Sequence, residues 1–397
     1  MKTLEVFYKD YNGPDRGARI KSVLKGALDG IPHYVVTDVR EIKKGSPVLF
    51  CFDLDEYGMD ESHVEVTRYV RSDEHALDGC VAGILVDGKG TLYTKSFARS
   101  LAFDINRAGA GLVGRPLVES VDGLKNFTIQ AANKNMTLEE AYVAAVRDLA
   151  QRLTEDGAGI SRYAAALGGT AAAGPVNDAA AETKPAAAGG GQAAQKIPAE
   201  PAGKPSILAL HVSNRSTSNT LAIWKMISAH LEGFDIREIS LRNGTLNDCA
   251  GCQYKTCLHF GEKGDCFYGG VMVSEVYPAV LAADAIVLLC PNYNDAVPAN
   301  MSSFINRLTA LFVTRRFYDK AVFAVVVSGY SGGDLVAEQI ISGMNMNKSF
   351  YLPPRFCLTE TANKAGEALR IPNIDEDVKK FAGSIKAYFA QLKPYFD

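Results

Sequence analysis

Eight consecutive polar residues at positions 213–220, SNRSTSNT, carry the strongest chemical signal in the sequence. They follow an apolar run, Ile207–Val212, with the length and composition of a buried parallel strand. After them, apolar residues recur at helical spacing over Thr220–Leu231. The first turn of a helix presents unpaired N–H groups and the positive end of the helix dipole, so hydroxyl-rich residues there suit a phosphate. The sequence therefore predicts an anion site at this turn, with Ser218 or Asn219 as the helix N-cap.

An ordinary helix start is the alternative interpretation, because Ser, Thr and Asn favour N-caps in general. One cap needs only one such residue, however, and this turn has seven together with Arg215. It lacks the Gly-Lys-Ser/Thr of a Walker A loop and the glycines of a dinucleotide-binding loop, which excludes both motifs. The candidate phosphate-binding residues are Ser213, Arg215, Ser216, Ser218, Asn219 and Thr220.

The turn resembles the first loop of the flavodoxin-like NAD(P)H-dependent FMN reductases and iron–sulfur flavoproteins, which reads roughly S-x-R-x-x-S-N-T and wraps the FMN phosphate. A second segment, Cys290–Met301, is similar to the P-x-Y-x-x-x-x-P segment that lies along the isoalloxazine in that family. The resemblance also implies a flavin contact from the glycine-rich loop Ser328–Asp334. The residues implied by these two segments are Pro291, Asn292, Tyr293, Asn294, Ser328, Gly329, Tyr330, Gly332 and Gly333.

This resemblance implies an FMN-dependent NAD(P)H oxidoreductase, which passes hydride from NAD(P)H to FMN and then to a quinone, flavin or protein acceptor. No catalytic side chain is expected, because the flavin accepts the hydride itself. The sequence has no H-E-x-x-H or G-x-S-x-G motif, which agrees with this expectation. The alternatives are an electron carrier or redox sensor without NAD(P)H turnover, and a non-enzymatic scaffold that binds no flavin.

Four cysteines follow the second expected strand of the C-terminal half with the spacing C-x2-C-x4-C-x8-C: Cys249, Cys252, Cys257 and Cys266. Iron–sulfur flavoproteins carry a [4Fe–4S] cluster at this topological place, with a tighter spacing of the first three cysteines. Zinc is a second interpretation, on four thiolates or with His259 replacing one of them. Unligated thiols are the third, since single cysteines are often core residues.

Strands and helices are expected to alternate on both sides of positions 157–204, and these elements must position the candidate residues. The expected strands are Leu4–Tyr8, Tyr34–Thr37, Val48–Phe52, Val81–Val86, one at Leu117, Ile207–Val212, Ile236–Leu241, Ala285–Leu289, Val322–Val327 and Arg355–Thr359. The expected helices are Ala18–Leu28, Glu61–Arg71, Lys95–Ala108, Thr137–Leu153, Thr220–Leu231, Val273–Ala282, Ala299–Phe312, Leu335–Met344 and Asp375–Leu392. Five βα units in each half predict two doubly wound, flavodoxin-like α/β domains with five-stranded parallel sheets.

The expected boundaries are a first domain at 1–156, a linker at 157–204 and an FMN-binding domain at 205–397. The linker segment is rich in Ala, Gly and Pro and cannot bury enough apolar surface to offset its ordering entropy. In the first domain, the loop after the first strand has two aspartates and no Ser or Thr. Carboxylates repel a phosphate, so this domain is expected to be a degenerate copy without FMN.

Composition limits the partners and the cellular location that can be expected for this chain. A net charge of −3 gives no electrostatic reason to expect nucleic acid or an anionic membrane as partner. The N-terminal residues contain no apolar signal-peptide core, and eight cysteines without such a signal indicate a reducing compartment, the cytoplasm. The resemblance further implies a homodimer or higher oligomer, because the open site of this family is often completed across a dimer.

Overall fold

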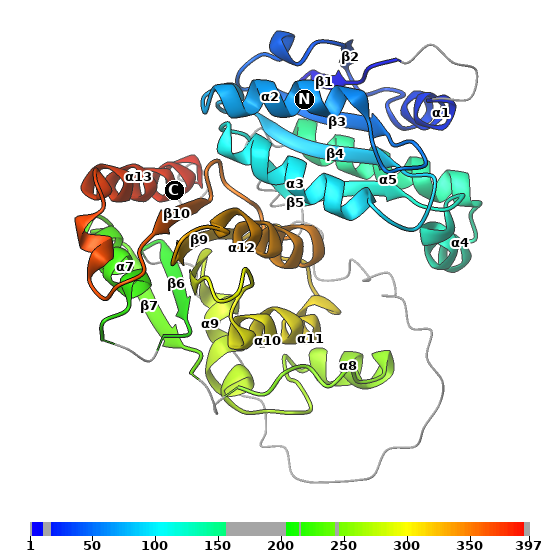
Figure 1. Ribbon diagram of the computed structural model, residues 1–397. Helices are drawn as coiled ribbons and strands as arrows, with labels where there is room; N and C mark the ends of the chain where they lie inside the picture. Colours follow the sequence, from blue (N-terminus) through cyan, green and yellow to red (C-terminus); the bar gives the residue numbers. More distant parts are fainter. Residues whose placement is uncertain (1, 11–16, 156–203, 214–215, 243–245, 393–397) are drawn as a thin grey trace.

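The computed structural model describes residues 2–10, 17–155, 204–213, 216–242 and 246–392 (Figure 1). Each half contains one five-stranded parallel sheet, ordered β2-β1-β3-β4-β5 and β7-β6-β8-β9-β10. Both orders are that of the doubly wound flavodoxin-like fold, which confirms the predicted fold class. The strands are β1 (Leu4–Phe7), β2 (His33–Val36), β3 (Pro47–Asp53), β4 (Val81–Asp87), β5 (Gly111–Ser120), β6 (Ser206–His211), β7 (Asp235–Ser240), β8 (Ala285–Pro291), β9 (Ala321–Ser328) and β10 (Cys357–Thr361).

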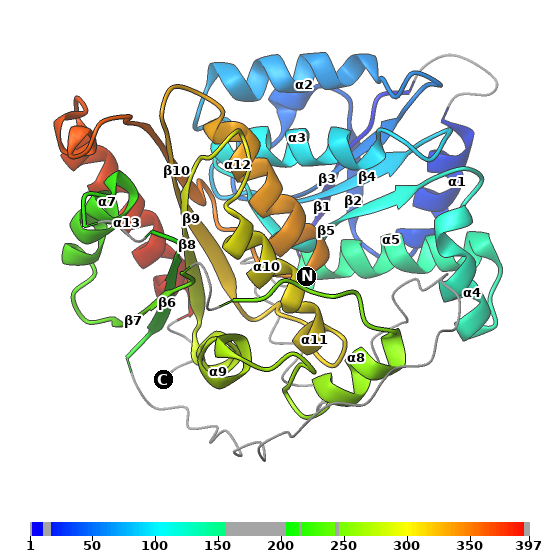
Figure 2. The same ribbon diagram turned by 60° about the horizontal axis from the view of Figure 1, so that its bottom comes forward.

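Helices cover both faces of each sheet (Figures 1 and 2). In the N-terminal half they are α1 (Ala18–Ala27), α2 (Glu61–Ser72), α3 (Thr94–Arg107), α4 (Thr128–Lys134) and α5 (Leu138–Glu155). In the C-terminal half they are α7 (Asn219–Ala229), α8 (Tyr254–Gly261), α9 (Tyr277–Ala282), α10 (Ala299–Arg307), α11 (Thr309–Phe312), α12 (Gly333–Ile340) and α13 (Ile374–Leu392). Short 3-10 turns lie at η1 (Val39–Glu41), η2 (Lys125–Phe127) and η5 (Glu367–Arg370), and π turns at η3 (Met272–Val276) and η4 (Ile341–Asn347).

Several elements differ from the sequence prediction for local reasons. The expected helix Ala299–Phe312 is divided at Leu308 into α10 and α11. Strand β10 begins at Cys357 instead of Arg355, because Arg355 has a left-handed φ of 52° that a strand does not accept. Helices α4 and α8 were not predicted. The expected linker, 157–204, lies almost entirely outside the described residues.

The core explains why the strands could be found in the sequence. Every residue of β3, β4 and β9 is buried, so these strands form continuous apolar runs with helices on both faces. One cluster of buried residues extends from the sheet of the N-terminal half to that of the C-terminal half. Helix α12 lies between the two sheets and packs against α3 (Figure 2). Among the described residues, no helix is both long and apolar enough to cross a membrane.

Candidate flavin site and cysteine cavity

The predicted phosphate turn lies between the carboxyl end of β6 and the start of α7. Ser218 is the N-cap, and its Oγ accepts a hydrogen bond of 3.3 Å from the backbone N–H of Leu221. A hydroxyl that accepts in this way still has its own hydrogen to donate. Ser213 and Thr220 are buried and Ser216 is exposed, whereas Arg215 lies outside the described residues. The helix start therefore offers an anion both hydroxyl and first-turn N–H donors.

The side chain of Asn219 holds the turn in place. Its amide nitrogen donates to the carbonyl oxygens of Ala362 (3.2 Å) and Lys364 (2.9 Å), and its Oδ1 accepts from Ala368 N (3.3 Å). These bonds use both amide hydrogens. Asn219 can therefore contribute to a phosphate site through its backbone N–H in the first helical turn, and its side chain fixes α7 to the segment after β10.

The second and third predicted loops meet at the carboxyl edge of β8 and β9. Pro291 is the last residue of β8, and the next residue, Asn292, joins the loops through its amide nitrogen. That nitrogen donates to Ser328 Oγ (3.1 Å) and Ser331 O (2.9 Å). The Oδ1 atom of Asn292 is buried and has no partner among the described residues. A buried acceptor without a partner is costly, so this atom is suited to receive an N–H donor from a ligand.

Two tyrosines present their rings at this edge. Tyr293 is 59% exposed and Tyr330 is 83% exposed, which is unusual for large aromatic side chains. The hydroxyl of Tyr330 accepts a hydrogen bond of 2.8 Å from the amide of Asn363, in the segment held by Asn219. All three predicted loops therefore form one connected rim, with flat apolar surface beside the start of α7.

Tight backbone geometry shapes the rim. Asn294 and its neighbour Asp295 have left-handed φ values of 54° and 57°, and Gly332 has a φ of 81°. A Cβ at Gly332 would lie 2.1 Å from Asp295 Oδ1, so only glycine fits there. Gly333 begins α12, and Gly329 leaves space beside Asn363. This donor set, the exposed rings and the buried free acceptor fit FMN.

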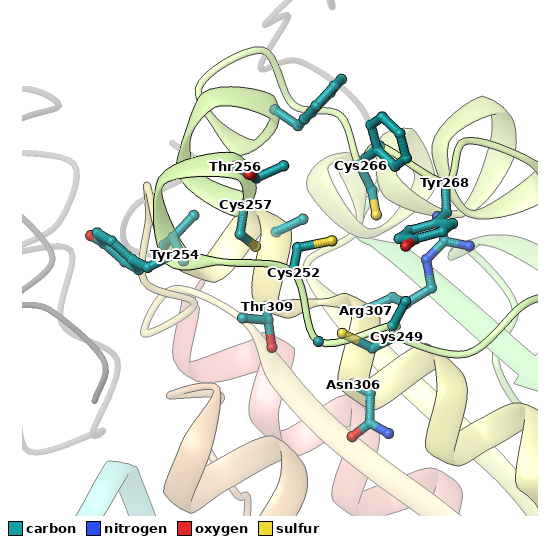
Figure 3. A pocket seen from close by; sticks show the side chains of 16 residues that line it. Cys249, Cys252, Tyr254, Thr256, Cys257, Cys266, Tyr268, Asn306, Arg307 and Thr309 are labelled. Carbon is teal, nitrogen blue, oxygen red and sulfur yellow. The ribbon is translucent and has the colours of Figure 1, made fainter. Parts of the chain in front are cut away.

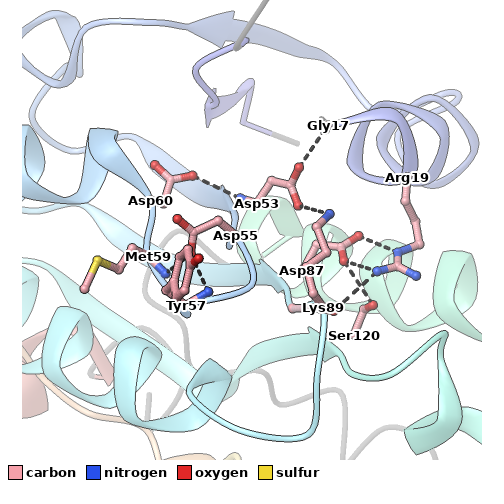
Figure 4. A network of polar contacts seen from close by, with 11 residues as sticks. Gly17, Arg19, Asp53, Asp55, Tyr57, Met59, Asp60, Asp87, Lys89 and Ser120 are labelled. Atoms are coloured by element: carbon pink, nitrogen blue, oxygen red, sulfur yellow. Dashed lines mark hydrogen bonds and ion pairs between the residues drawn. The ribbon is translucent and has the colours of Figure 1, made fainter. Parts of the chain in front are cut away.

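The corresponding edge of the N-terminal sheet is built differently (Figure 4). Asp53, at the end of β3, is 2% exposed and accepts a hydrogen bond of 2.6 Å from Gly17 N, directly before α1. Its other oxygen pairs with Lys89 at 2.9 Å. Asp87, at the end of β4, forms a two-bond ion pair with Arg19. A protein carboxylate thus lies at the helix start where a phosphate would otherwise be expected.

The four cysteines of the C-terminal half line one cavity of about 170 Å³ (Figure 3). Cys249 is exposed, and Cys252, Cys257 and Cys266 are half-buried. Burial and the neighbouring thiols raise the pKa of Cys257 to about 11 and also raise that of Cys252. The thiols of Cys252 and Cys257 therefore favour the protonated form until a cation replaces the proton.

Arg307 fixes both ends of the cysteine segment. Its guanidinium is buried and donates to Asn247 O (3.4 Å) and Gly269 O (2.8 Å). His259 pairs instead with Lys263 and is not among the described residues that line the cavity. Within the described ranges, no three His, Cys, Asp or Glu side chains are placed to hold one metal ion. The geometry thus gathers the cysteines without forming a single-ion zinc site, and metal binding stays a prediction.

Three positioning residues were missed from the sequence: Asn363, Arg307 and Asp53. Asn363 and Arg307 act through partners distant in sequence, which a single loop motif does not reveal. Asp53 ends an apolar strand, and a polar residue directly after such a run is the one signal that pointed to it.

Comparison with known proteins agrees with the site. Residues 205–363 match the family model described as NADPH-dependent FMN reductase. This confirms the resemblance seen in the loop motifs, and the matched segment contains all three of the predicted loops. No curated protein matches the sequence.

Solved structures with a similar fold each correspond to about half of the chain. RosB with bound 8-demethyl-8-formylriboflavin-5'-phosphate is 14% identical, with a TM-score of 0.36, over 49% of this chain and 82% of that one. An FMN-dependent NADH-azoreductase from Bacillus anthracis in complex with FMN is 9% identical, with a TM-score of 0.31, over 46% of this chain and 99% of that one. An NAD(P)H:quinone oxidoreductase from Methanothermobacter marburgensis is 14% identical, with a TM-score of 0.33, over 48% and 96%.

Proposed function

We propose that the domain at 205–397, whose residues 205–363 match the FMN reductase family, is an FMN-dependent NAD(P)H oxidoreductase that passes hydride to a quinone, flavin or protein acceptor. One observation carries the proposal: an anion-binding helix start and two loops with exposed tyrosines form one rim at the carboxyl edge of the sheet. FMN, when bound, would supply the hydride-accepting centre. The protein residues then need only bind the FMN, orient NAD(P)H and the acceptor against it, and shield it from water.

The phosphate is assigned to the start of α7. Ser218 donates its hydroxyl, and the first-turn N–H groups, including that of Asn219, supply neutral donors. Ser213, Ser216 and Thr220 belong to the same turn, and Arg215 is assigned a cationic contact from its place in the motif. A phosphate held this way needs little counter-charge.

The ring is assigned to the two other loops. Pro291, Tyr293 and Tyr330 supply flat surface, while Asn292 and Ser328 supply polar atoms at its edge. Gly329, Gly332 and Gly333 let the third loop pack closely against Asn363, Asp295 and Ser328, and Asn294 follows the exposed Tyr293 in a left-handed turn. One face stays open for NAD(P)H.

The N-terminal domain is proposed to bind no FMN. The Asp53 carboxylate already accepts from the N–H at the start of α1, and a second anion there would be repelled. A cytoplasmic location and a homodimer or higher oligomer, both expected from the sequence, belong to the same proposal.

The test is an ultraviolet–visible spectrum of the full chain, purified anaerobically and supplied with FMN, before and after NADPH. Retained flavin bands that bleach with NADPH or NADH are the expected result. Flavin that binds but ignores both nucleotides contradicts the reductase proposal. Failure to retain any flavin contradicts the site assignment as well.

A second candidate function is an iron–sulfur flavoprotein that acts as an electron carrier or redox sensor. It is favoured by the convergence of Cys249, Cys252, Cys257 and Cys266 on one cavity. Four thiolates are the ligand set of a [4Fe–4S] cluster, and the cluster would supply one-electron chemistry. Iron analysis of protein reconstituted with iron and sulfide tests it: Cys252→Ser should lose the iron, while Cys51→Ser, at a buried core thiol, should retain it.

A further inference from the structure

The contact between the two halves has an internal two-fold pattern. Leu112, at the start of β5, and Leu352, just before β10, form an antiparallel bridge. Leu112 N donates to Leu352 O at 2.9 Å, and Leu352 N donates to Leu112 O at 3.0 Å. Since β5 and β10 are the fifth strands of their sheets, equivalent residues exchange reciprocal bonds. This is the arrangement that a two-fold axis produces.

Two buried asparagines repeat the pattern on each side of the bridge. Asn106, at the end of α3, donates to Pro353 O at 2.8 Å. Asn345, after α12, donates to Val113 O at 3.0 Å. Each asparagine thus reaches the carbonyl one residue beyond the bridging leucine of the other half, and each also donates to a carbonyl of its own half.

One departure from symmetry has a covalent cause. The Oδ1 of Asn106 accepts from Phe356 N at 3.1 Å, four residues beyond the bridge. The equivalent residue in the other half is Pro116, which has no N–H. Correspondingly, the Oδ1 of Asn345 is buried without a partner among the described residues. The two sides are therefore copies of one design that have diverged.

Opposite charges meet where identical copies would place like charges. Arg99 on α3 pairs with Glu338 on α12 at 2.8 Å, and 239 positions separate them. The same spacing separates the two asparagines, so Arg99 and Glu338 are equivalent residues facing each other across the axis. In a dimer of two C-terminal domains, Glu338 would face Glu338.

A second charge pair acts in the same direction. Arg355 and its equivalent Arg115 share a left-handed φ of 52°. Arg355 pairs at 2.6 Å with Asp78, which lies just before β4. On the other side of the contact, Arg115 lies near Arg316, just before β9. Burial and the charge of Arg115 lower the pKa of Arg316. A second C-terminal domain would therefore bring Arg355 toward Arg316, with like charges opposed.

We propose that the N-terminal domain is a built-in dimer partner for the C-terminal domain. It occupies the place that a second copy of the C-terminal domain would take in an isologous dimer, and the Arg99–Glu338 and Arg355–Asp78 pairs select it over that copy. The face formed by α12 and η4 is thus closed to other chains. A homodimer of the whole chain must use another face.

The test starts from the full chain, folded first and then cut at a protease site inserted after Ala180. Native mass spectrometry should show one N-terminal and one C-terminal fragment together, with the mass of the intact 42.7 kDa chain plus the insert. Glu338→Arg and Arg99→Glu should each weaken association about 10- to 100-fold, because like charges then meet. The double exchange should restore it. Arg40→Glu, whose arginine pairs with Asp38 inside the N-terminal half, is the matched control.

Each other outcome overturns the proposal. Fragments that separate on cutting show that the interface does not hold the halves. Pairs of C-terminal fragments show that charge does not select the partner. If the fragments of the double variant associate as weakly as those of either single variant, Arg99 and Glu338 do not act as a pair. If one single variant fails to fold, the other single variant and the double variant decide the test.

Discussion

Replacing Ser218 with alanine tests the phosphate assignment most directly. The Ser218 Oγ accepts from Leu221 N and keeps its own hydrogen for a phosphate oxygen. Riboflavin lacks only the phosphate of FMN. Comparing the two ligands therefore separates the phosphate contact from every contact with the ring.

The expected magnitude follows from the two roles of this hydroxyl. Loss of the N-cap should lower the free energy of unfolding by about 1 kcal/mol. A hydrogen bond to a charged group contributes about 1.5–3 kcal/mol, so FMN affinity should fall about 10- to 100-fold. Riboflavin affinity should change by no more than about twofold. Both constants come from fluorescence titration of the apoprotein.

Ser228→Ala is the matched control, because Ser228 is on the same helix and its hydroxyl donates to Lys225 O at the opposite end. It should leave both affinities unchanged. If Ser218→Ala weakens FMN and riboflavin equally, the residue supports the fold of the site and does not bind phosphate. If neither affinity changes, the helix start is not the phosphate site.

Three further outcomes are expected. Gly332→Ala should lower the melting temperature more than Gly366→Ala in thermal unfolding, since both glycines have left-handed φ but only Gly332 has a neighbouring atom in the way. Alkylation of Cys257 should keep accelerating from pH 9 toward its raised pKa of about 11, as mass-spectrometric labelling would show, because only the thiolate reacts. Asp53→Ala should cost about 2 kcal/mol in chemical denaturation, because a buried hydrogen bond to a charged group is lost.

The sequence predicted those parts of the fold that depend on local patterns. Continuous apolar runs located β3, β4 and β9, since strands buried on both faces are apolar up to their last residues, Asp53, Asp87 and Ser328. Hydroxyl-rich residues located the start of α7 and its cap, Ser218. The expected helix at Thr137 begins with a capping box, in which Thr137 and Glu140 form reciprocal bonds of 2.8 and 3.1 Å.

What the sequence did not reveal depends on contacts between distant segments. Helix α8 has only eight residues, too few for a helical pattern to stand out in the sequence, and packs against α11 with Gly261 close to Ala310. The bonds from the Asn219 side chain to residues after β10 have no trace in the local motif, which predicts only a phosphate contact for this residue. The tandem sheets were expected, but their mutual contact rests on residues such as Asn106 and Asn345, which are isolated in sequence.

The shared core has a consequence for how the chain opens. Because one buried cluster includes Phe50 of the first sheet and Leu288 of the second, each half shares part of its apolar interior with the other, beside a cluster of its own. A local opening that exposes one sheet must expose the contact surface of the other. Backbone amides in β4 and β8 should therefore exchange with solvent deuterium at the same slow rate, through one global event. Two folds side by side then behave as a single cooperative unit.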